Sequence, residues 1–318
     1  MDRRNMKVNE WEELTSWLGD EGIDCYAELI WGAPGETPES FMAGYDRLAD
    51  RVTRIAVYPM LLLPNTRYSE RKADYGIVSV RGDRDDFEYV LATGWVSFAE
   101  NQRMHRFLFW ARVVAEMAVL RHVWHGLRRL AGIRQSAVLK SLDSWFGEAD
   151  DPSAEPMREA MRSAVFGAGD FGAGVAFLYT DPAAKRLLRR WWTERMTPLL
   201  PPEAAPVIEE MFRYDLLTMP LVGDDAAQAE GTVAVRGEVY HVRRGVRLAH
   251  DVPAITAALR AGATPDPLPG PVTVDLYYRA HAETAVNSTN HEIIVHYLGM
   301  PLAEITENAA ADAGDSYR

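Results

Sequence analysis

The residues best suited to chemistry lie between Glu28 and Thr37, in the sequence ELIWGAPGET. An apolar run that predicts a buried strand ends there in a turn from Gly32 to Gly35, and Thr37 predicts the start of a helix. Glycine lets the backbone approach a ligand closely, and the first turn of a helix attracts anionic groups. The pattern favours a small-molecule site at a strand end, although a purely structural turn uses the same residues.

Two further motifs are weaker because their predicted surroundings do not match the chemistry. The segment Gly167–Gly172 has the spacing GxGxxG, but a dinucleotide fingerprint follows a strand, and here the preceding residues predict a helix. A flexible turn between helices is therefore favoured. His291 and His296 resemble a zinc-protease motif with one residue too many, and in the predicted strand their rings point to opposite faces.

Other reactive residue types fit structural roles better than functional ones. His122 and His125 share a helical face without a carboxylate or cysteine beside them, which favours an ordinary helix surface over a metal site. The basic and aromatic run 185–192 fits an amphipathic helix better than a nucleic-acid surface. Cys25 falls in a predicted buried strand, where a thiol usually acts as a small apolar group.

Composition excludes several classes of protein. The 318 residues carry 34 Lys and Arg against 46 Asp and Glu, a net charge of −12, which argues against a nucleic-acid partner. One cysteine in the chain rules out an internal disulfide and an iron–sulfur cluster held by this chain alone. The N-terminus lacks an apolar signal region, and the apolar stretch 107–120 is short and charged, so we expect a cytoplasmic protein with no membrane partner.

The elements that position the first motif read as alternating helices and strands. We expect a helix capped by Asn9, a strand over 25–31, a helix from Thr37 to about Asp50 and a second strand over 54–63. Two such units in series predict parallel strands with helices outside, which is the α/β class.

Beyond residue 70 the predicted organisation changes twice. Residues 71–96 are charged and rich in turn formers, and we expect a linker; residues 97–222 predict a helical region that opens with one helix of about thirty positions from Ser97 through Leu127. Residues 223–318 predict a small α+β domain with a hairpin at Arg236-Gly237 and strands over 273–278 and 292–297.

Residues 1–70 resemble the cobalamin-binding branch of the radical S-adenosylmethionine (SAM) enzymes. Members of this branch carry ELIxGxPGET on the fifth strand of a partial (β/α) barrel, as Glu28–Thr37 does, and IxxYPLxxLPxT on the sixth strand, as residues 55–66 do. The opening Arg3-Arg4-Asn5-Met6 resembles the helix before the fifth strand. Beyond residue 70 the pattern resembles the C-terminal region of natural-product C-methyltransferases of the branch.

The resemblance implies a fold and a set of cofactor-binding residues. Residues 1–70 would be the C-terminal part of the partial barrel. Its fifth strand would place Ile30, Gly32 and Glu36 near the adenine of SAM. Its sixth strand would place Tyr58, Pro59 and Met60 there, although Met60 stands where the family usually has leucine.

The resemblance also implies cofactors and a partner. The cluster loop CxxxCxxC, the motif for the methionine amino group and the cobalamin domain of the family precede the region that this sequence matches. We therefore expect a truncated or split methyltransferase that does not hold the [4Fe-4S] cluster or cobalamin, has no metal site and is not competent for radical chemistry alone. Its partners would be an N-terminal radical SAM half or a full-length homologue, and a small-molecule substrate.

The residues leave the catalytic groups and the methyl acceptor unidentified, and two alternatives stay open. The chain can be a non-catalytic binding or scaffold subunit of a full-length radical SAM enzyme. It can also be an unrelated α/β enzyme that uses Glu36 or a histidine as a base.

Overall fold

The structure is a computed structural model that describes residues 8–21, 23, 25–82, 87–164, 171–227, 229–287 and 289–305. It divides into two compact units. The first comprises Met1–Glu116 and Arg134–Phe171, and the second comprises Met117–Ile133 and Gly172–Arg318. The chain is of the mixed α/β class, as predicted.

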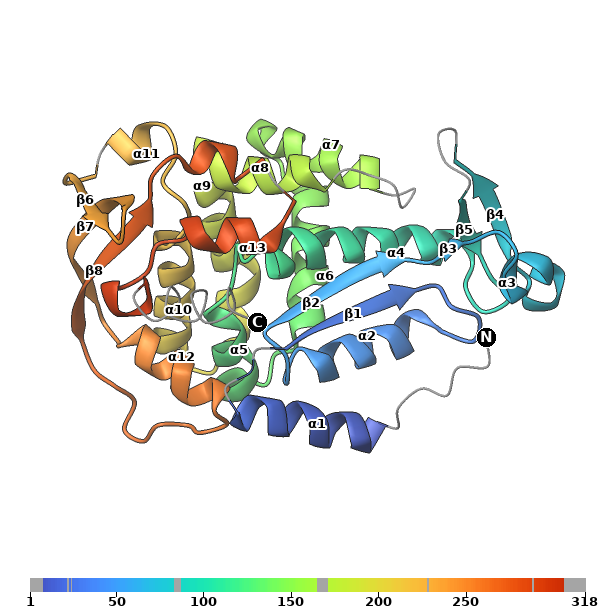
Figure 1. Ribbon diagram of the computed structural model, residues 1–318, viewed down its shortest axis with the longest axis horizontal. Helices are drawn as coiled ribbons and strands as arrows, with labels where there is room; N and C mark the ends of the chain where they lie inside the picture. Colours follow the sequence, from blue (N-terminus) through green and yellow to red (C-terminus); the bar gives the residue numbers. More distant parts are fainter. Residues whose placement is uncertain are drawn as a thin grey trace. The chain divides into compact units, whose positions relative to one another are not determined.

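The first unit contains the predicted pair of parallel strands. Strand β1 (Tyr26–Trp31) pairs with β2 (Arg54–Pro59), and helix α2 (Pro38–Leu48) connects them, as Figure 1 shows. The Thr37 side chain caps α2 in a reciprocal hydrogen-bond pair with Ser40, so the predicted helix start is confirmed. Helix α1 (Val8–Asp20) precedes β1 and already includes Asn9, so the prediction that Asn9 caps this helix is wrong.

The predicted second strand is split between two sheets. β2 ends at Pro59, and after Met60 the chain forms β3 (Leu61–Leu62), which pairs with another strand, β5 (Glu88–Ala92). The cause is the apolar core of the second sheet, where Leu62 is buried with Ile77 and Val90. The prediction of strand structure over 54–63 is correct, but the segment forms two strands in two sheets and not one continuous strand.

Residues 71–96, which we expected to be a linker, hold regular structure. After α3 (Arg67–Glu70) and a 3₁₀ turn (Lys72–Tyr75), β4 (Val78–Arg81) completes an antiparallel sheet in the order β3-β5-β4. Within the described residues of this unit the sheets are small and no closed barrel forms.

Helices pack beside the parallel strands of the first unit. Besides α1 and α2 they are α4 (Phe98–Trp110), α6 (Gln135–Glu148) and α7 (Glu155–Ser163), with a 3₁₀ turn at Pro152–Ala154. The predicted capping box of Ser97 and Glu100 at the start of α4 is confirmed. Edge-to-face contacts of Phe41 with Trp31 and with Phe107 join β1, α2 and α4 in one aromatic core.

The predicted thirty-residue helix is wrong beyond Glu116. After α4 the helix continues only as a π-helical segment, η2 (Ala111–Glu116), and Ala118 then adopts a left-handed backbone with φ 58°. A separate helix, α5 (Val123–Ala131), follows in the second unit. The buried Asp215 carboxylate starts α5 because it accepts the backbone N–H groups of His122 and Val123 at 2.8 and 3.1 Å.

The rest of the second unit combines helices with an antiparallel sheet. Its helices are α8 (Gly172–Thr180), α9 (Pro182–Trp191) with a π-helical extension (Trp192–Met196) and a 3₁₀ turn (Thr197–Leu199), α10 (Ala205–Leu217), α11 (Asp224–Ala227) and α12 (Val252–Arg260). Its strands are β6 (Thr232–Val235), β7 (Glu238–Leu248) and β8 (Val272–Arg279), in that order in the sheet. The Arg236-Gly237 hairpin is confirmed.

One predicted strand of the second unit is helical instead. Residues 292–297 belong to α13 (His291–Ile294) and a 3₁₀ turn (Val295–Tyr297), after another 3₁₀ turn at Ala282–Thr284. The Asn290 side chain accepts the Glu292 N–H at 2.9 Å and starts this helix despite the β-branched residues that follow. No helix among the described residues is both long and apolar enough to cross a bilayer.

Candidate functional site

The turn after β1 is built around two glycines and one carboxylate. Gly32 and Gly35 have φ values of 97° and 91°, in the left-handed region that favours glycine. The Glu36 carboxylate accepts the Gly32 N–H at 3.0 Å and so closes the turn on itself. Partial burial raises the pKa of Glu36, while the backbone N–H groups of Gly32 and Ala33 oppose the rise. In this arrangement Glu36 fixes the shape of the turn.

The end of β1 is tied to two other elements by a buried amide. The Trp31 indole N–H donates to Oδ1 of Asn101 on α4 at 2.7 Å, and Nδ2 of Asn101 donates to the Val90 carbonyl of β5 at 2.9 Å. Sequence reasoning missed Asn101, because a partner seventy residues from Trp31 leaves no local pattern. The amide holds the edge of the parallel sheet against its helix.

The predicted cofactor-binding residues gather at this edge. In the β1–β2 register Ile30 lies opposite Tyr58, and Trp31 lies opposite Pro59. Met60 donates its N–H to the Trp31 carbonyl at 2.8 Å, and its Cβ lies 3.8 Å from the position that a Cβ on Gly32 would take. Both motifs of the sequence thus meet at the carboxyl ends of two parallel strands, where ligands bind in α/β sheets. The adenine-binding roles of these residues stay predictions.

One face of the parallel pair is open along β1, whereas on β2 the same face is covered at Ala56, which is 2% exposed. Alternate residues of β1 point outward, and Tyr26 and Ile30 are 57% and 59% exposed, whereas Trp31 on the other face is 1% exposed. The Arg54 guanidinium lies 4.3 Å from the centre of the Tyr26 ring on the outward side. Parallel sheets are ordinarily covered on both faces, so this face is suited to bind a further layer of protein or a ligand.

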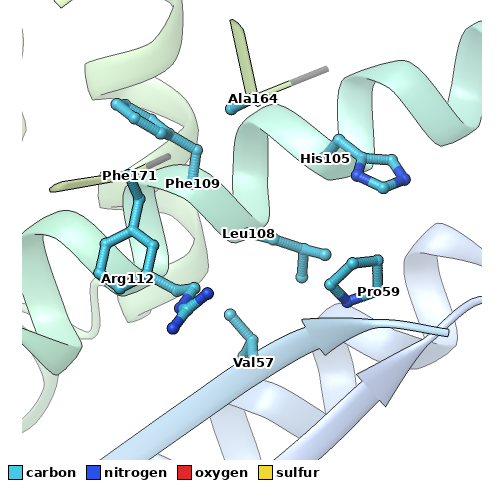
Figure 2. Close-up of a pocket in the computed structure, with 8 residues that line it drawn as sticks. All are labelled: Val57, Pro59, His105, Leu108, Phe109, Arg112, Ala164 and Phe171. Carbon is cyan, nitrogen blue, oxygen red and sulfur yellow. The ribbon is translucent and has the colours of Figure 1, made fainter. Parts of the chain in front are cut away.

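A small pocket lies where β2 meets α4 and η2, and Figure 2 shows its lining side chains. Its volume is about 30 Å³, which admits one or two water molecules or a group of similar size. The apolar lining residues are Val57, Pro59, Leu108, Phe109, Ala164 and Phe171. Two polar side chains complete it: Arg112 near Phe171 and Val57, and His105 near Pro59 (Figure 2).

The Arg112 guanidinium is held between aromatic rings and a carboxylate. Its central carbon lies 3.6 Å from the centre of the Phe171 ring and 5.1 Å from that of the Tyr58 ring. Its Nε donates to Glu116 at 3.3 Å. Burial raises the pKa of Glu116, and Arg112 opposes the rise. Burial, followed by the Glu116 charge, raises the pKa of Tyr58.

His105 is neutral near pH 7. Its side chain is 6% exposed, and burial lowers its pKa to about 4. Among the described residues no group hydrogen-bonds its ring. Sequence reasoning did not single out Arg112 or His105, because their helical spacing matches that of an ordinary amphipathic face.

The remaining sequence candidates do not come together into a site. His122 is buried in the second unit, at 8% exposure, and burial lowers its pKa well below the usual value, so a solvated helix surface was the wrong expectation for it. Burial also lowers the pKa of His125 to about 4. His291 and His296 lie on a helical turn and not on a strand. In the described part of the chain no group of three or more His, Cys, Asp or Glu side chains is placed to hold a metal ion.

The GxGxxG segment and Cys25 are the remaining sequence candidates. Residues 167–170 of the GxGxxG segment lie outside the described residues, and Gly172 opens α8. Cys25 is partly buried just before β1, with its Sγ 3.7 Å from the Ile23 carbonyl.

Comparison with known proteins gives one informative similarity. No protein-family model matches the chain. The chain is similar to a 2-(S-pantetheinyl)-carbapenam-3-carboxylate methyltransferase of Streptantibioticus cattleyicolor, with 28% identity over 167 residues. The similarity covers 48% of this chain and 24% of the relative. It is a distant, partial similarity to a methyltransferase.

Proposed function

We propose that the first unit forms the C-terminal strands of the partial barrel of a cobalamin-binding radical SAM methyltransferase that acts on a natural-product intermediate. The observation that carries the proposal is the parallel register of β1 and β2, which brings the fifth- and sixth-strand motifs to one edge. The partial similarity to a carbapenam methyltransferase supports the same family and reaction.

The residues at this edge fit one wall of a SAM site. The exposed Ile30 side chain beside Tyr58 offers an apolar surface for a planar base, and the turn held by Glu36 keeps the backbone close to it. SAM, when bound, supplies the methyl group and the adenosyl group of the family reaction. In our proposal Ile30, Tyr58 and the turn bind and orient its adenine.

The described residues do not fit an iron–sulfur cluster. The chain has one cysteine, and no metal-binding group of side chains lies in the described ranges. We therefore derive no catalytic step through a cluster or through cobalamin. In the proposal these cofactors are bound by other residues, on the same polypeptide or on a partner that covers the open face along β1.

The lack of cluster ligands in the described residues also favours the second candidate, a non-catalytic subunit. A parallel sheet with an open face can pair with a radical SAM enzyme without taking part in its chemistry. The two candidates make the same prediction for association and different predictions for catalysis.

Association in trans tests the proposal. The chain is co-expressed anaerobically with the carbapenam methyltransferase from which the segment matching this chain has been removed, and the relative's own segment supplied in trans is the positive control. We expect a stable complex that cleaves SAM to 5′-deoxyadenosine. A complex without cleavage supports the scaffold candidate. No complex, when the positive control assembles, contradicts both.

A matched pair of variants locates the contact. Ile30 in the first unit and Leu199 in the second are 59% and 60% exposed, so neither contributes much to its own core. We expect Ile30→Asp to abolish the complex, because it places a charge on the face that must be covered, and Leu199→Asp to leave it intact. Equal effects of the two substitutions would show that the open face is not the contact.

A further inference from the structure

The pocket between β2, α4 and η2 combines an unusual helix geometry with polar groups that lack partners. Arg112 lies in the π-helical segment η2, and such segments are rare and occur frequently at functional sites. The nearly buried His105 ring lines the same pocket without a hydrogen-bond partner among the described residues.

Arg112 has hydrogen-bond donors that are available to a ligand. Its Nε donates to Glu116, while no acceptor among the described residues meets its two terminal amino groups. The guanidinium lies over the Phe171 ring, and its terminal amino groups stay available to a ligand. A fixed guanidinium edge matches the two oxygens of a carboxylate or a phosphate.

Charge and size favour a carboxylate over a phosphate. Glu116 already offsets part of the Arg112 charge, and His105 is neutral near pH 7, so the pocket suits a single negative charge better than a double one. The volume of about 30 Å³ admits a carboxylate but not a nucleoside. The pocket therefore takes the carboxylate group alone, and the apolar body of the acid extends out of it past apolar side chains such as Leu108 and Phe171.

We propose that this pocket binds the carboxylate of an apolar organic acid, with the terminal amino groups of Arg112 on the carboxylate oxygens. That the acid is the methyl acceptor rests on the proposed function; that the pocket binds a carboxylate does not. Arg112 lies over Tyr58, which pairs in register with Ile30. An acid bound there would lie next to the proposed adenine wall.

Titration of the whole chain with benzoate at pH 7.5 and constant ionic strength tests the pocket. The signal is the imidazole resonance of His105 in NMR spectra, assigned by its loss in His105→Gln. We expect a saturable shift with benzoate, little shift with the neutral isostere benzamide, and at least fivefold weaker binding of inorganic phosphate. Equal binding of benzoate and benzamide, or tighter binding of phosphate, would overturn the carboxylate assignment.

Two variants with opposite expected effects secure the result. Arg112→Gln should weaken benzoate binding at least tenfold, whereas Arg103→Gln, the same change on the exposed face of α4, should leave it unchanged. Glu116→Gln removes the competing carboxylate and should tighten binding severalfold. If Arg112→Gln fails to fold, Glu116→Gln still decides, because weaker or unchanged binding in it contradicts the proposal.

The outcome is separable from that of the proposed function. If benzoate binds but the chain does not associate in trans, the carboxylate pocket is supported and the methyltransferase proposal is contradicted. If the chain associates in trans and the complex cleaves SAM but benzoate does not bind, the methyltransferase proposal is supported and the carboxylate pocket is contradicted.

Discussion

Asn101→Ala tests how the edge of the parallel sheet is held. The substitution leaves two buried groups without partners: the indole N–H of Trp31 and the carbonyl of Val90, which are 1% and 7% exposed as residues. An unpaired buried donor or acceptor costs about 1–3 kcal/mol, so for the two groups we expect a loss of about 2–6 kcal/mol in the free energy of unfolding. That is a large share of the roughly 5–15 kcal/mol that stabilises a typical domain.

Hydrogen exchange read by mass spectrometry is the assay of choice, because the chain has two compact units and global unfolding need not be two-state. Peptides covering β1 and α4 should lose protection in Asn101→Ala, while peptides covering α10 in the second unit should not. Arg103→Ala, on the exposed side of α4, is the control and should change protection by less than about 0.5 kcal/mol.

A double-mutant cycle with Trp31→Phe isolates the hydrogen bond itself. Phenylalanine keeps an aromatic ring and removes the indole N–H, so each single variant breaks the same contact. We expect the two losses to be non-additive, with a coupling free energy of about 1 kcal/mol or more. Additive losses would refute the reasoning, because they would mean that Trp31 and Asn101 do not interact in the folded protein.

Three further predictions concern the same unit. NMR titration should give His105 a pKa near 4. Because this pKa lies below the unfolded value of 6.5, the free energy of unfolding should fall by up to about 3 kcal/mol as pH drops from 6.5 to 4. A measured pKa near 6.5 would contradict the burial of His105. In urea unfolding, Gly32→Ala should lower the free energy of unfolding by about 1–3 kcal/mol, because φ of Gly32 is 97°. Gly44→Ala in α2 should raise it by up to about 1 kcal/mol. Equal effects of the two substitutions would contradict this reasoning. Asp46→Ala should lower the free energy of unfolding by about 1–3 kcal/mol and reduce hydrogen-exchange protection in α6. The reason is that the buried Asp46 carboxylate accepts hydrogen bonds from the N–H and the hydroxyl of Ser136. Unchanged protection in α6 would contradict this contact.

Signals that act within a few residues predicted the local structure well. The cap at Thr37, the capping box at Ser97 and the hairpin at Arg236-Gly237 each need only neighbouring residues, and all are present. The parallel pairing of β1 and β2 also follows from local patterns, because a helix between two neighbouring strands is the usual crossover of a parallel pair.

The predictions that were wrong depend on interactions between residues far apart in the sequence. Apolar spacing continues through residues 117–122, but Asp215 starts a new helix there from ninety-three residues away. The split of β2 from β3 depends on the core that Leu62 shares with Val90. The amphipathic spacing of His105 and Arg112 gave no sign of a pocket, since only the folded chain brings β2 and Phe171 to that face.

Arg112 connects the two proposals through the pleat of β2. Val57 and Pro59 face the pocket, and Tyr58 between them points to the opposite side of the strand, where it pairs in register with Ile30. The Arg112 guanidinium lines the pocket and also lies 5.1 Å from the centre of the Tyr58 ring, so it reaches both sides of the strand. A carboxylate bound at Arg112 would therefore share Tyr58 with a base packed on Ile30. In the proposed methyltransferase, the acceptor acid would then lie beside the adenine wall, connected to it through Arg112 and Tyr58.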